Sequence, residues 1–377
     1  MKIEIITPSL TRSSGGVGKV VVDVYSNIAK RNPDTIIELN SLNYEDESLY
    51  HANDDLKNLS SKIYNAIPPK RLGFSPRLVK NAFSHESSLV HLHGIWMATT
   101  LYGNIAKFSN RTPTIISPHG MLNPWILSRG PLLKKTLKFL YEGYSWNKAN
   151  AFHALNTQEA DAILKVLPNA NIHIIPNGID IPDTNLYLQK NAAEITLITY
   201  LGRLHEKKNI LGLIEAINNI SQIDYDKSPF ILNIAGWGEP EYEALVINTI
   251  KGSKSERFNF VGPIFGNDKD SLLKNSDAFI LPSFSEGLPL TILESWSYGI
   301  PVLMSKHCNL TDAIEEGIAI DTGTDVKDIT NSITKFLNLS GKEKSDLSQA
   351  SYDYVKSKYN WETVCDQYME LYRMYGL

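Results

Sequence analysis

Short apolar runs alternate with helically spaced apolar positions along the whole chain. In residues 17–28, Val17, Val21, Val24 and Ile28 fall on one helical face, which predicts an amphipathic helix. The apolar runs of the first half predict strands at Ile3–Thr7, Thr35–Leu39, Ser88–Leu92, Pro113–Ser117, Ala151–Leu155 and Ile172–Ile175.

The second half repeats this alternation. Strands are predicted at Ile195–Leu201, Phe230–Ala235, Phe258–Val261, Ala278–Leu281 and Val302–Ser305. Helices are predicted at Ile210–Ile220, Glu241–Ile250, Asp268–Asn275, Leu290–Tyr298 and Asp325–Leu337. Two serial βα arrays predict an α/β protein with two doubly wound, open parallel sheets, although the pattern alone leaves one eight-stranded barrel open.

The boundary between the halves is expected in Pro176–Glu194, which contains two prolines, an Asn-Gly pair and no sustained period. We therefore predict one domain over residues 1–185 and a second over 186–360. The tail from Trp361 to Tyr375 has a helical pattern and follows the last predicted strand.

Composition narrows the class of protein. The 377 residues are 42% hydrophobic and 21% charged, so the chain can bury real cores and is not of the disordered type. The two cysteines, Cys308 and Cys365, do not make a disulfide scaffold, so a reducing compartment is expected. No apolar run reaches the ~18 residues of a membrane-spanning helix, and the first residues read as a core strand rather than a signal peptide. A cytoplasmic protein is expected.

Charge is divided unevenly along the chain. Residues 1–190 hold 20 Lys and Arg against 15 Asp and Glu, whereas the remainder holds 17 against 26. A basic first half favours an anionic partner such as a membrane surface or a phosphorylated acceptor. The excess is too small and too dispersed to predict nucleic-acid binding.

In open parallel sheets, ligands bind beyond the carboxyl ends of the strands, and several candidate residues follow strands directly. The segment 11–18, TRSSGGVG, precedes the first helix. Glycines such as Gly15 and Gly16 let a backbone approach a phosphate at a helix N-terminus. The segment is neither a dinucleotide fingerprint nor a P-loop, and a flexible turn explains it equally well.

A second candidate follows the first strand of the second half. Arg203 and Lys208, in GRLHEKKN, could together neutralise a diphosphate, since Arg binds phosphate bidentately and Lys acts as a point charge. A solvated charged loop is the alternative explanation.

The most informative segment is FSEGLPLTILE, residues 284–294, after the strand Ala278–Leu281. Glu286 lies in a loop, and Glu294 lies on a helix among apolar residues. A carboxylate there needs donors, which sugar hydroxyls could supply. The alternative for Glu294 is a structural ion pair.

In the first half, histidines also lie at or just after the ends of predicted strands. His119, in SPHGM, could hold a substrate hydroxyl, as could His91 and His93, but a lone histidine is more often a structural hydrogen-bonding residue. No zinc-type spacing and no G-x-S-x-G elbow is present. The D-x-D at 224–226 precedes a strand, so a surface turn is the better explanation for it.

Together these segments resemble the retaining glycosyltransferases of family 4, which have the two-domain GT-B fold, in the version found in bacterial capsule and O-antigen enzymes. The stretch from Glu286 to Glu294 resembles the family's E-x7-E signature, and Gly202 to Lys208 resembles its G-R-x-x-x-x-K diphosphate motif. The glycine loop at Gly15-Gly16, the segment IPNGID at 175–180 and SPHGML at 117–122 resemble further family segments.

The resemblance implies two Rossmann-like domains facing each other across a cleft, with the acceptor on the first and the nucleotide-sugar donor on the second. It implies that the helix 361–377 returns to the first domain. It implies that Arg203 and Lys208 bind the donor diphosphate, that Glu294 binds the ribose, and that Glu286 and His119 lie at the sugar. The remaining donor-binding residues that it implies are Gly15, Gly16, Gly236, Pro263, Ile264, Gly287 and Leu288.

A UDP-sugar is the first expectation for the donor and GDP-mannose the second. No cofactor and no metal are expected, because the two cations would stabilise the departing diphosphate. The acceptor would be a glycan or a polyprenyl-diphosphate-linked sugar. Residues 61–80 and 129–148 combine cations with apolar and aromatic side chains, which predicts peripheral binding to an anionic membrane, with basic-faced core helices as the alternative. A nucleotide-sugar epimerase or hydrolase of the same fold, and a non-catalytic nucleotide-sugar-binding module, remain open alternatives.

Overall fold

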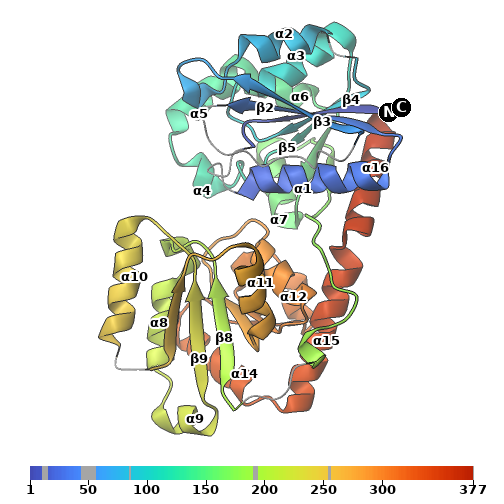
Figure 1. Cartoon of the computed structure of the whole chain (residues 1–377). Coiled ribbons are helices and arrows are strands. Elements are labelled where there is room, and N and C mark those ends of the chain that lie inside the picture. The colour runs from blue at the N-terminus through green and yellow to red at the C-terminus, as the bar shows by residue number, and fades with distance from the viewer. Residues whose placement is uncertain (11–15, 44–56, 85, 190–193, 254–255, 377) are drawn as a thin grey trace. The chain divides into compact units, whose positions relative to one another are not determined.

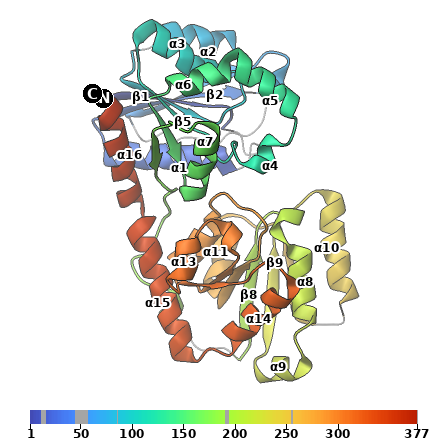
Figure 2. The same cartoon turned by 180° about the vertical axis from the view of Figure 1, so that it is seen from behind.

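A computed structural model of the chain describes residues 1–10, 16–43, 57–84, 86–189, 194–253 and 256–376. The chain forms two compact units, one of Met1–Gly178 with Trp361–Leu377 and the other of Ile179–Asn360. The change from the first unit to the second lies a few residues before the boundary expected after residue 185. Figures 1 and 2 show the elements of each unit from opposite sides.

In its described part, the first unit is built on a parallel sheet of seven strands in the order β3-β2-β1-β4-β5-β6-β7. Its strands are β1 (Lys2–Thr7), β2 (Ile36–Asn43), β3 (Leu59–Asn65), β4 (Leu89–His93), β5 (Thr114–Ser117), β6 (Ala151–Ala154) and β7 (Ile172–Ile174). Its helical elements are α1 (Gly16–Arg31), η2 (Lys70–Leu72), α2 (Pro76–Ser84), α3 (Thr100–Asn110), α4 (Pro124–Leu127), α5 (Pro131–Leu137), η3 (Lys138–Glu142), α6 (Gly143–Lys148), α7 (Thr157–Val166) and α16 (Trp361–Gly376).

Two apolar clusters hold the helices of the first unit against its sheet. Val21, Tyr25 and Ile28 of α1 and Val364 and Tyr368 of α16 belong to one cluster. Helices α2, α3 and α6 contribute to the other. Figure 1 shows α1 and α16 side by side, with α2 and α3 across the sheet from them. The last helix of the chain therefore completes the core of the first unit.

The second unit is also built on a parallel sheet, with six strands in its described part in the order β10-β9-β8-β11-β12-β13. The strands are β8 (Thr196–Leu201), β9 (Phe230–Ala235), β10 (Phe258–Gly262), β11 (Ala278–Leu281), β12 (Val302–Met304) and β13 (Ala319–Asp321). The helical elements are η4 (Tyr187–Gln189), η5 (Glu206–Lys208), α8 (Ile210–Asn218), α9 (Gln222–Lys227), α10 (Pro240–Gly252), α11 (Gly266–Asn275), α12 (Leu290–Ser297), η6 (Lys306–Cys308), α13 (Thr311–Glu315), α14 (Val326–Leu337) and α15 (Gly341–Lys358).

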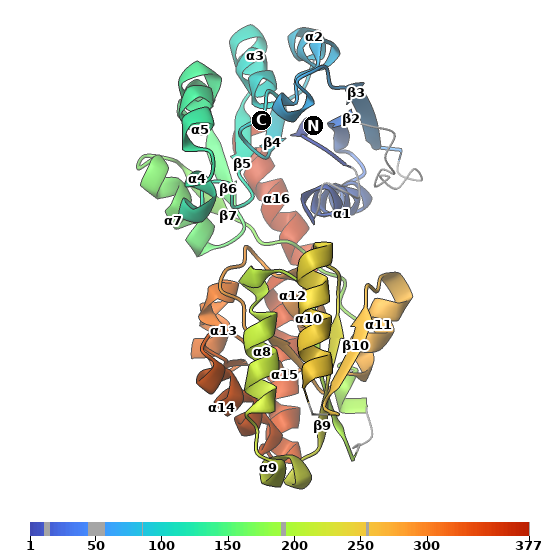
Figure 3. The same cartoon turned by 90° about the vertical axis from the view of Figure 1, so that its left-hand side faces the viewer.

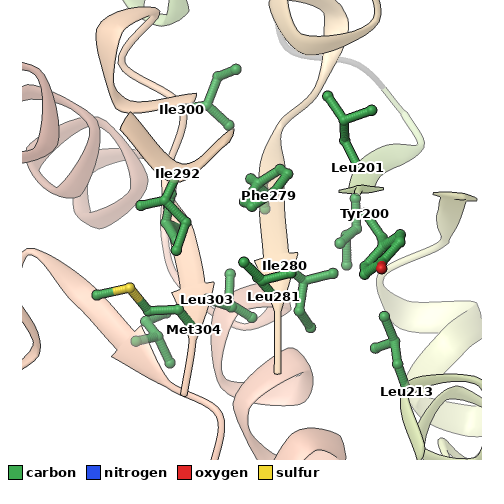
Figure 4. Packing of buried hydrophobic residues seen from close by; sticks show 14 of the residues in the cluster. Tyr200, Leu201, Leu213, Phe279, Ile280, Leu281, Ile292, Ile300, Leu303 and Met304 are labelled. Atoms are coloured by element: carbon green, nitrogen blue, oxygen red, sulfur yellow. The ribbon is translucent and has the colours of Figure 1, made fainter. Parts of the chain in front are cut away.

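One continuous core fills the second unit. Strands β8, β11 and β12 contribute fully buried residues, among them Tyr200, Phe279 and Leu303, which pack with Leu213 of α8 and Ile292 of α12 (Figure 4). Helices α8 and α11 lie on opposite faces of this sheet (Figures 1 and 2). Helix α14 packs beside α8, and α15 packs beside α12. Each unit is thus a doubly wound parallel sheet, as the sequence predicts, and the single barrel is excluded.

Sequence reasoning predicted neither the strands β3 and β13 nor the helices α3, α4, α13 and α15, and it misjudged the D-x-D segment. Residues 224–226 lie within α9, a short helix, rather than in the expected turn. The segment 61–80 begins inside β3 and continues through η2 into α2. Because β3 is an edge strand with mostly exposed side chains, its sequence lacks the apolar run of a central strand.

Candidate functional site

The predicted donor-binding residues of the second unit follow the carboxyl ends of its central strands. The chain order of the sheet reverses between β8 and β11, since β9 and β10 lie on one side and β12 and β13 on the other. In open parallel sheets this reversal marks the crevice where ligands bind. Arg203 and Lys208 follow β8, and Glu286 follows β11, so these residues border the reversal point (Figure 3 shows the helices around this sheet).

An ion pair joins Lys208 to Glu286 at this point. The Lys208 Nζ lies 2.6 Å from the Glu286 Oε1, and their side chains are only 20% and 10% exposed. The Ser283 hydroxyl donates a second hydrogen bond to the same oxygen at 2.6 Å. Since a partly desolvated pair interacts more strongly than one in water, the ammonium and the carboxylate are held in fixed positions.

The loop that carries Glu286 is tied to both neighbouring strand ends. The Phe284 N–H donates to the Lys207 carbonyl at 2.7 Å, and the Glu286 N–H donates to the His307 carbonyl at 3.0 Å. The Asn309 amide donates to the carbonyls of Glu286 and Gly287, at 2.8 and 2.9 Å. Sequence reasoning missed Asn309, which adopts the left-handed conformation (φ 63°) that asparagine enters more readily than most residues.

Arg203 has a different carboxylate partner. Its Nη2 lies 3.0 Å from the Glu239 Oε1, with the two side chains 58% and 74% exposed. Exposed pairs of this kind contribute little, so Arg203 can exchange Glu239 for an incoming anion at small cost. The Tyr200 hydroxyl donates to the Arg203 carbonyl at 3.0 Å and thereby fixes the backbone from which the guanidinium extends.

Glu294 lies on α12 and pairs with Lys269 of α11. The Oε1–Nζ distance is 2.6 Å, and both side chains are about a quarter exposed, at 23% and 25%. This is the ion pair that a purely structural role would require. Its presence is compatible with either role, so ribose binding by Glu294 stays a prediction.

Gly236 permits a close approach between the loops after β8 and β9. Its φ is +147°, and an added Cβ would lie 1.8 Å from the Gly202 carbonyl oxygen. The Leu204 N–H donates to the Trp237 carbonyl at 2.7 Å, which joins the same two loops. The position therefore needs glycine for conformation and for space.

Exposed aromatic rings border this glycine. The Trp237 ring lies with its centroid 5.1 Å from that of Phe265, and the two side chains are 45% and 63% exposed. Pro263 is exposed and Ile264 is half-buried between Gly262 and Phe265. Phe265 was missed by sequence reasoning because an isolated aromatic residue before a helix gives no signal by itself.

In the first unit, His119 follows β5 in a strained turn. His119 and Gly120 both have positive φ, at 52° and 76°. The Gly120 N–H donates to the Glu159 Oε1 at 2.6 Å, while the Leu155 N–H donates to its Oε2 at 2.9 Å. Burial raises the pKa of Glu159. The turn that presents His119 is thus anchored to α7, whose N-terminus is capped by the Asn156 side chain.

The histidines of β4 lie behind His119. His119 Nε2 is 2.8 Å from His93 Nδ1, and their rings stack at 5.1 Å. Burial and neighbouring histidines lower the pKa of His91 and His93 well below the ordinary value, and burial lowers the pKa of His119 to about 3. These rings are therefore neutral at physiological pH. Gly16 is the first residue of α1, and Gly15 lies outside the described residues.

Both cysteines are free and buried, and burial raises each thiol pKa to about 12. Within the described ranges, no three His, Cys, Asp or Glu side chains are grouped as metal ligands. The helices of the described residues include none with the length and apolar character to cross a bilayer.

Comparison with known proteins agrees with this architecture. Residues 14–182 match the family described as Glycosyltransferase Family 4, and residues 188–354 match Glycosyl transferases group 1. The lipopolysaccharide 1,2-N-acetylglucosaminetransferase of Salmonella typhimurium is 24% identical over 97% of this chain and 96% of its own length. The Escherichia coli UDP-Gal:alpha-D-GlcNAc-diphosphoundecaprenol alpha-1,3-galactosyltransferase is 28% identical over 61% of this chain and 60% of its length.

Among solved structures, Anabaena HepE in complex with UDP and glucose has a TM-score of 0.74 at 18% identity, covering 99% of this chain and all of that one. The two matched families together span both units of the present chain. The chain belongs to the family 4 glycosyltransferases of the GT-B fold.

Proposed function

We propose that this glycosyltransferase moves a sugar, with retention at the anomeric carbon, from a nucleotide-diphosphate sugar to a glycan or polyprenyl-diphosphate-linked acceptor in bacterial surface polysaccharide synthesis. The main support is the Lys208–Glu286 pair at the strand reversal point of the second unit. A cation for phosphate and a carboxylate for hydroxyls, held side by side, match the two halves of a nucleotide sugar.

Lys208 and Arg203 would act on the leaving group. Cleavage of the bond between the sugar and the diphosphate places negative charge on the diphosphate, and fixed cations stabilise that charge most where water is excluded. With two side-chain cations in place, the reaction would need no metal ion.

Glu286 would accept hydrogen bonds from hydroxyls of the donor sugar, helped by the backbone at Gly287 and Leu288. The acceptor hydroxyl would attack from the face that the diphosphate leaves, and a phosphate oxygen would take its proton. The new glycosidic bond then forms as the sugar–phosphate bond breaks. Glu294 would accept hydrogen bonds from the ribose hydroxyls, either in place of its ion pair with Lys269 or in addition to it.

A UDP-sugar remains the first candidate donor and GDP-mannose the second. Two observations support this order. Next to Gly236, the exposed rings of Trp237 and Phe265, tilted at 49° to each other, offer apolar faces on which a base can stack. In addition, the name of the E. coli galactosyltransferase includes UDP-Gal, and the HepE structure is a complex with UDP and glucose. The E. coli relative's diphosphoundecaprenol acceptor supports a lipid-linked acceptor here.

A thermal-shift screen of UDP- and GDP-sugars tests the donor site. We expect one nucleotide sugar at 100 times its Kd to raise the unfolding temperature by about 5–10 °C, since such binding adds about 2.7 kcal/mol to a unit of this size. Arg203→Ala and Glu294→Ala should each reduce the shift. Arg373→Ala, an exposed arginine of α16, is the control and should keep it. Equal stabilisation of the Arg203 variant and the parent by the nucleotide sugar would contradict a role of Arg203 in donor binding.

Membrane binding is proposed through the surface of α5 and η3. Leu132, Phe139 and Leu140 are 80%, 89% and 65% exposed, and Lys135 and Lys138, which lie between Leu132 and Phe139 in the sequence, are exposed as well. Exposed apolar side chains next to lysines suit the interface of an anionic bilayer. The segment 61–80 supports this less strongly, because Lys62 is already paired with Glu38 at 2.8 Å.

Vesicle sedimentation tests this surface. The parent should bind phosphatidylglycerol vesicles more tightly than phosphatidylcholine vesicles. The double variant Phe139→Ser/Leu140→Ser should lose tenfold or more of that affinity, because burying one such side chain contributes about 1.5–3 kcal/mol. Leu245→Ser, at an exposed leucine of α10, is the matched control and should bind as the parent does. Equal binding to both vesicle types, or to neither, would contradict the proposal.

A further inference from the structure

A chain of hydrogen-bonded side chains runs through the first unit from His119 to the carbonyl of Ile175. It links α1, β4, β5, β6 and α16, and all its members except His119 are buried. The contacts, in order, are His119 Nε2–His93 Nδ1 at 2.8 Å, His93 Nε2–Tyr25 OH at 2.7 Å, Tyr25 OH–Tyr372 OH at 2.9 Å, Tyr372 OH–His91 Nδ1 at 2.8 Å, His91 Nε2–Ser117 Oγ at 2.7 Å, Ser117 Oγ–His153 Nδ1 at 2.6 Å and His153 Nε2–Ile175 O at 2.7 Å.

The Ile175 carbonyl, at the buried end of this series of contacts, determines which atom is the donor in each hydrogen bond. A carbonyl can only accept, so His153 Nε2 carries the proton of that bond. In a neutral ring His153 Nδ1 is then an acceptor, and it receives the Ser117 hydroxyl proton. The Ser117 oxygen must in turn accept from His91 Nε2, which leaves His91 Nδ1 as an acceptor. Burial lowers the pKa of His153 to about 4, which is consistent with the neutral ring.

Proton counting decides the next step. Tyr25 OH, Tyr372 OH and His91 Nδ1 form a triangle with sides of 2.8, 2.9 and 3.0 Å. Only the two phenol protons are available to it, because His91 Nδ1 carries none. If Tyr25 gave its proton to His93, the one remaining phenol proton could bridge only one of the three short contacts, and these side chains would form one hydrogen bond fewer in the buried interior. Both phenol protons therefore belong inside the triangle.

The outer end of the chain follows from this. Since Tyr25 does not donate to His93, His93 Nε2 donates to the Tyr25 oxygen, and His93 Nδ1 becomes an acceptor. His119 must then supply the proton of its contact with His93, from Nε2. The remaining nitrogen, His119 Nδ1, carries a lone pair. His119 is only partly buried and follows β5, at the edge of the sheet where ligands bind.

We propose that Tyr25 and His93 are positioning residues that hold His119 as the Nε2–H tautomer, so that its Nδ1 accepts a hydrogen bond from a ligand hydroxyl. The identity of that ligand as a sugar rests on the proposed function. A nitrogen with a lone pair attracts a hydroxyl and repels a phosphate oxygen. The series of hydrogen bonds therefore determines which group of a nucleotide sugar can lie against His119. Which ring nitrogen of His119 carries the proton thus depends on residues that do not contact the ligand.

Long-range proton–nitrogen correlation NMR of the full-length protein labelled with 15N-histidine tests the tautomer directly. The His119 signals are assigned by their loss in His119→Gln. We expect a protonated Nε2 and an unprotonated Nδ1 in the parent. Tyr25→Phe, which keeps the ring but removes the oxygen that accepts from His93 Nε2, should produce a mixture of both tautomers. Tyr372→Phe should keep the parent tautomer, because the Tyr25 hydroxyl can still donate to His91 Nδ1 at 3.0 Å. Thermal unfolding of each variant checks that the fold is retained.

Tyr368→Phe is the matched control. Its hydroxyl lies 3.4 Å from His153 Nε2, on the same helix as Tyr372 but outside the chain, so its loss should leave the His119 tautomer unchanged. A parent protein protonated at His119 Nδ1, or a Tyr25→Phe variant with an unchanged tautomer, would overturn the inference. The NMR measurement needs no donor, so its failure is distinct from that of the proposed function, which a lack of nucleotide-sugar binding would reveal.

Discussion

Replacing Lys208 by alanine is expected to lower kcat by about 10²–10³-fold, the usual cost of losing one group that stabilises charge in the transition state. The expected cause is the loss of the ammonium that Glu286 holds beside the departing diphosphate. Release of nucleoside diphosphate that depends on an acceptor measures the rate. Lys207→Ala, one residue earlier in η5, is the control and should leave kcat unchanged.

The same substitution also removes the partner of Glu286, whose side chain is only 10% exposed. An unpaired, largely buried carboxylate can cost about 3–5 kcal/mol of stability, so the single variant could lose activity by unfolding. The double variant Lys208→Ala/Glu286→Gln removes both charges and should recover the free energy of unfolding without recovering the rate. A double variant that transfers sugar as fast as the parent would show that neither charge takes part.

Gly236→Ala is expected to reduce the free energy of unfolding of the second unit by more than about 3 kcal/mol and to abolish the donor-induced thermal shift. The added Cβ would overlap the Gly202 carbonyl, at 1.8 Å, so the loops after β8 and β9 must separate. That separation displaces Arg203 and Trp237, which lie on those loops. Urea unfolding, followed by hydrogen exchange to assign the loss to the second unit, measures the effect.

The control for this prediction is Gly252→Ala. An added Cβ on Gly252, at the end of α10, meets nothing within 4 Å, so this variant should unfold as the parent does and keep its response to the donor. If Gly236→Ala instead matched Gly252→Ala in both measurements, the close approach of the two loops would have no importance for the site.

Local pattern was enough to predict most of the fold. Central strands such as β9 and β11 are buried on both faces, so the sequence of β11 is a continuous apolar run and that of β9 is interrupted only by Asn233. The edge strand β3 carries exposed serines and a lysine, and the last strand, β13, has only three residues, so neither has such a run. Helix α15 is mostly polar because it contacts the core along a narrow stripe.

The sequence by itself determined that two βα arrays exist and that particular charged residues and histidines follow strands, because both facts depend on neighbours along the chain. Only the tertiary structure decided which of these residues meet. Lys208 and Glu286 are 78 positions apart and pair because β8 and β11 are adjacent in the sheet. The path from His119 to Ile175 requires three strands and two helices, one of them at the far end of the sequence. The spacing of residues in the sequence does not show which distant residues come into contact, because strand order and helix packing determine those contacts.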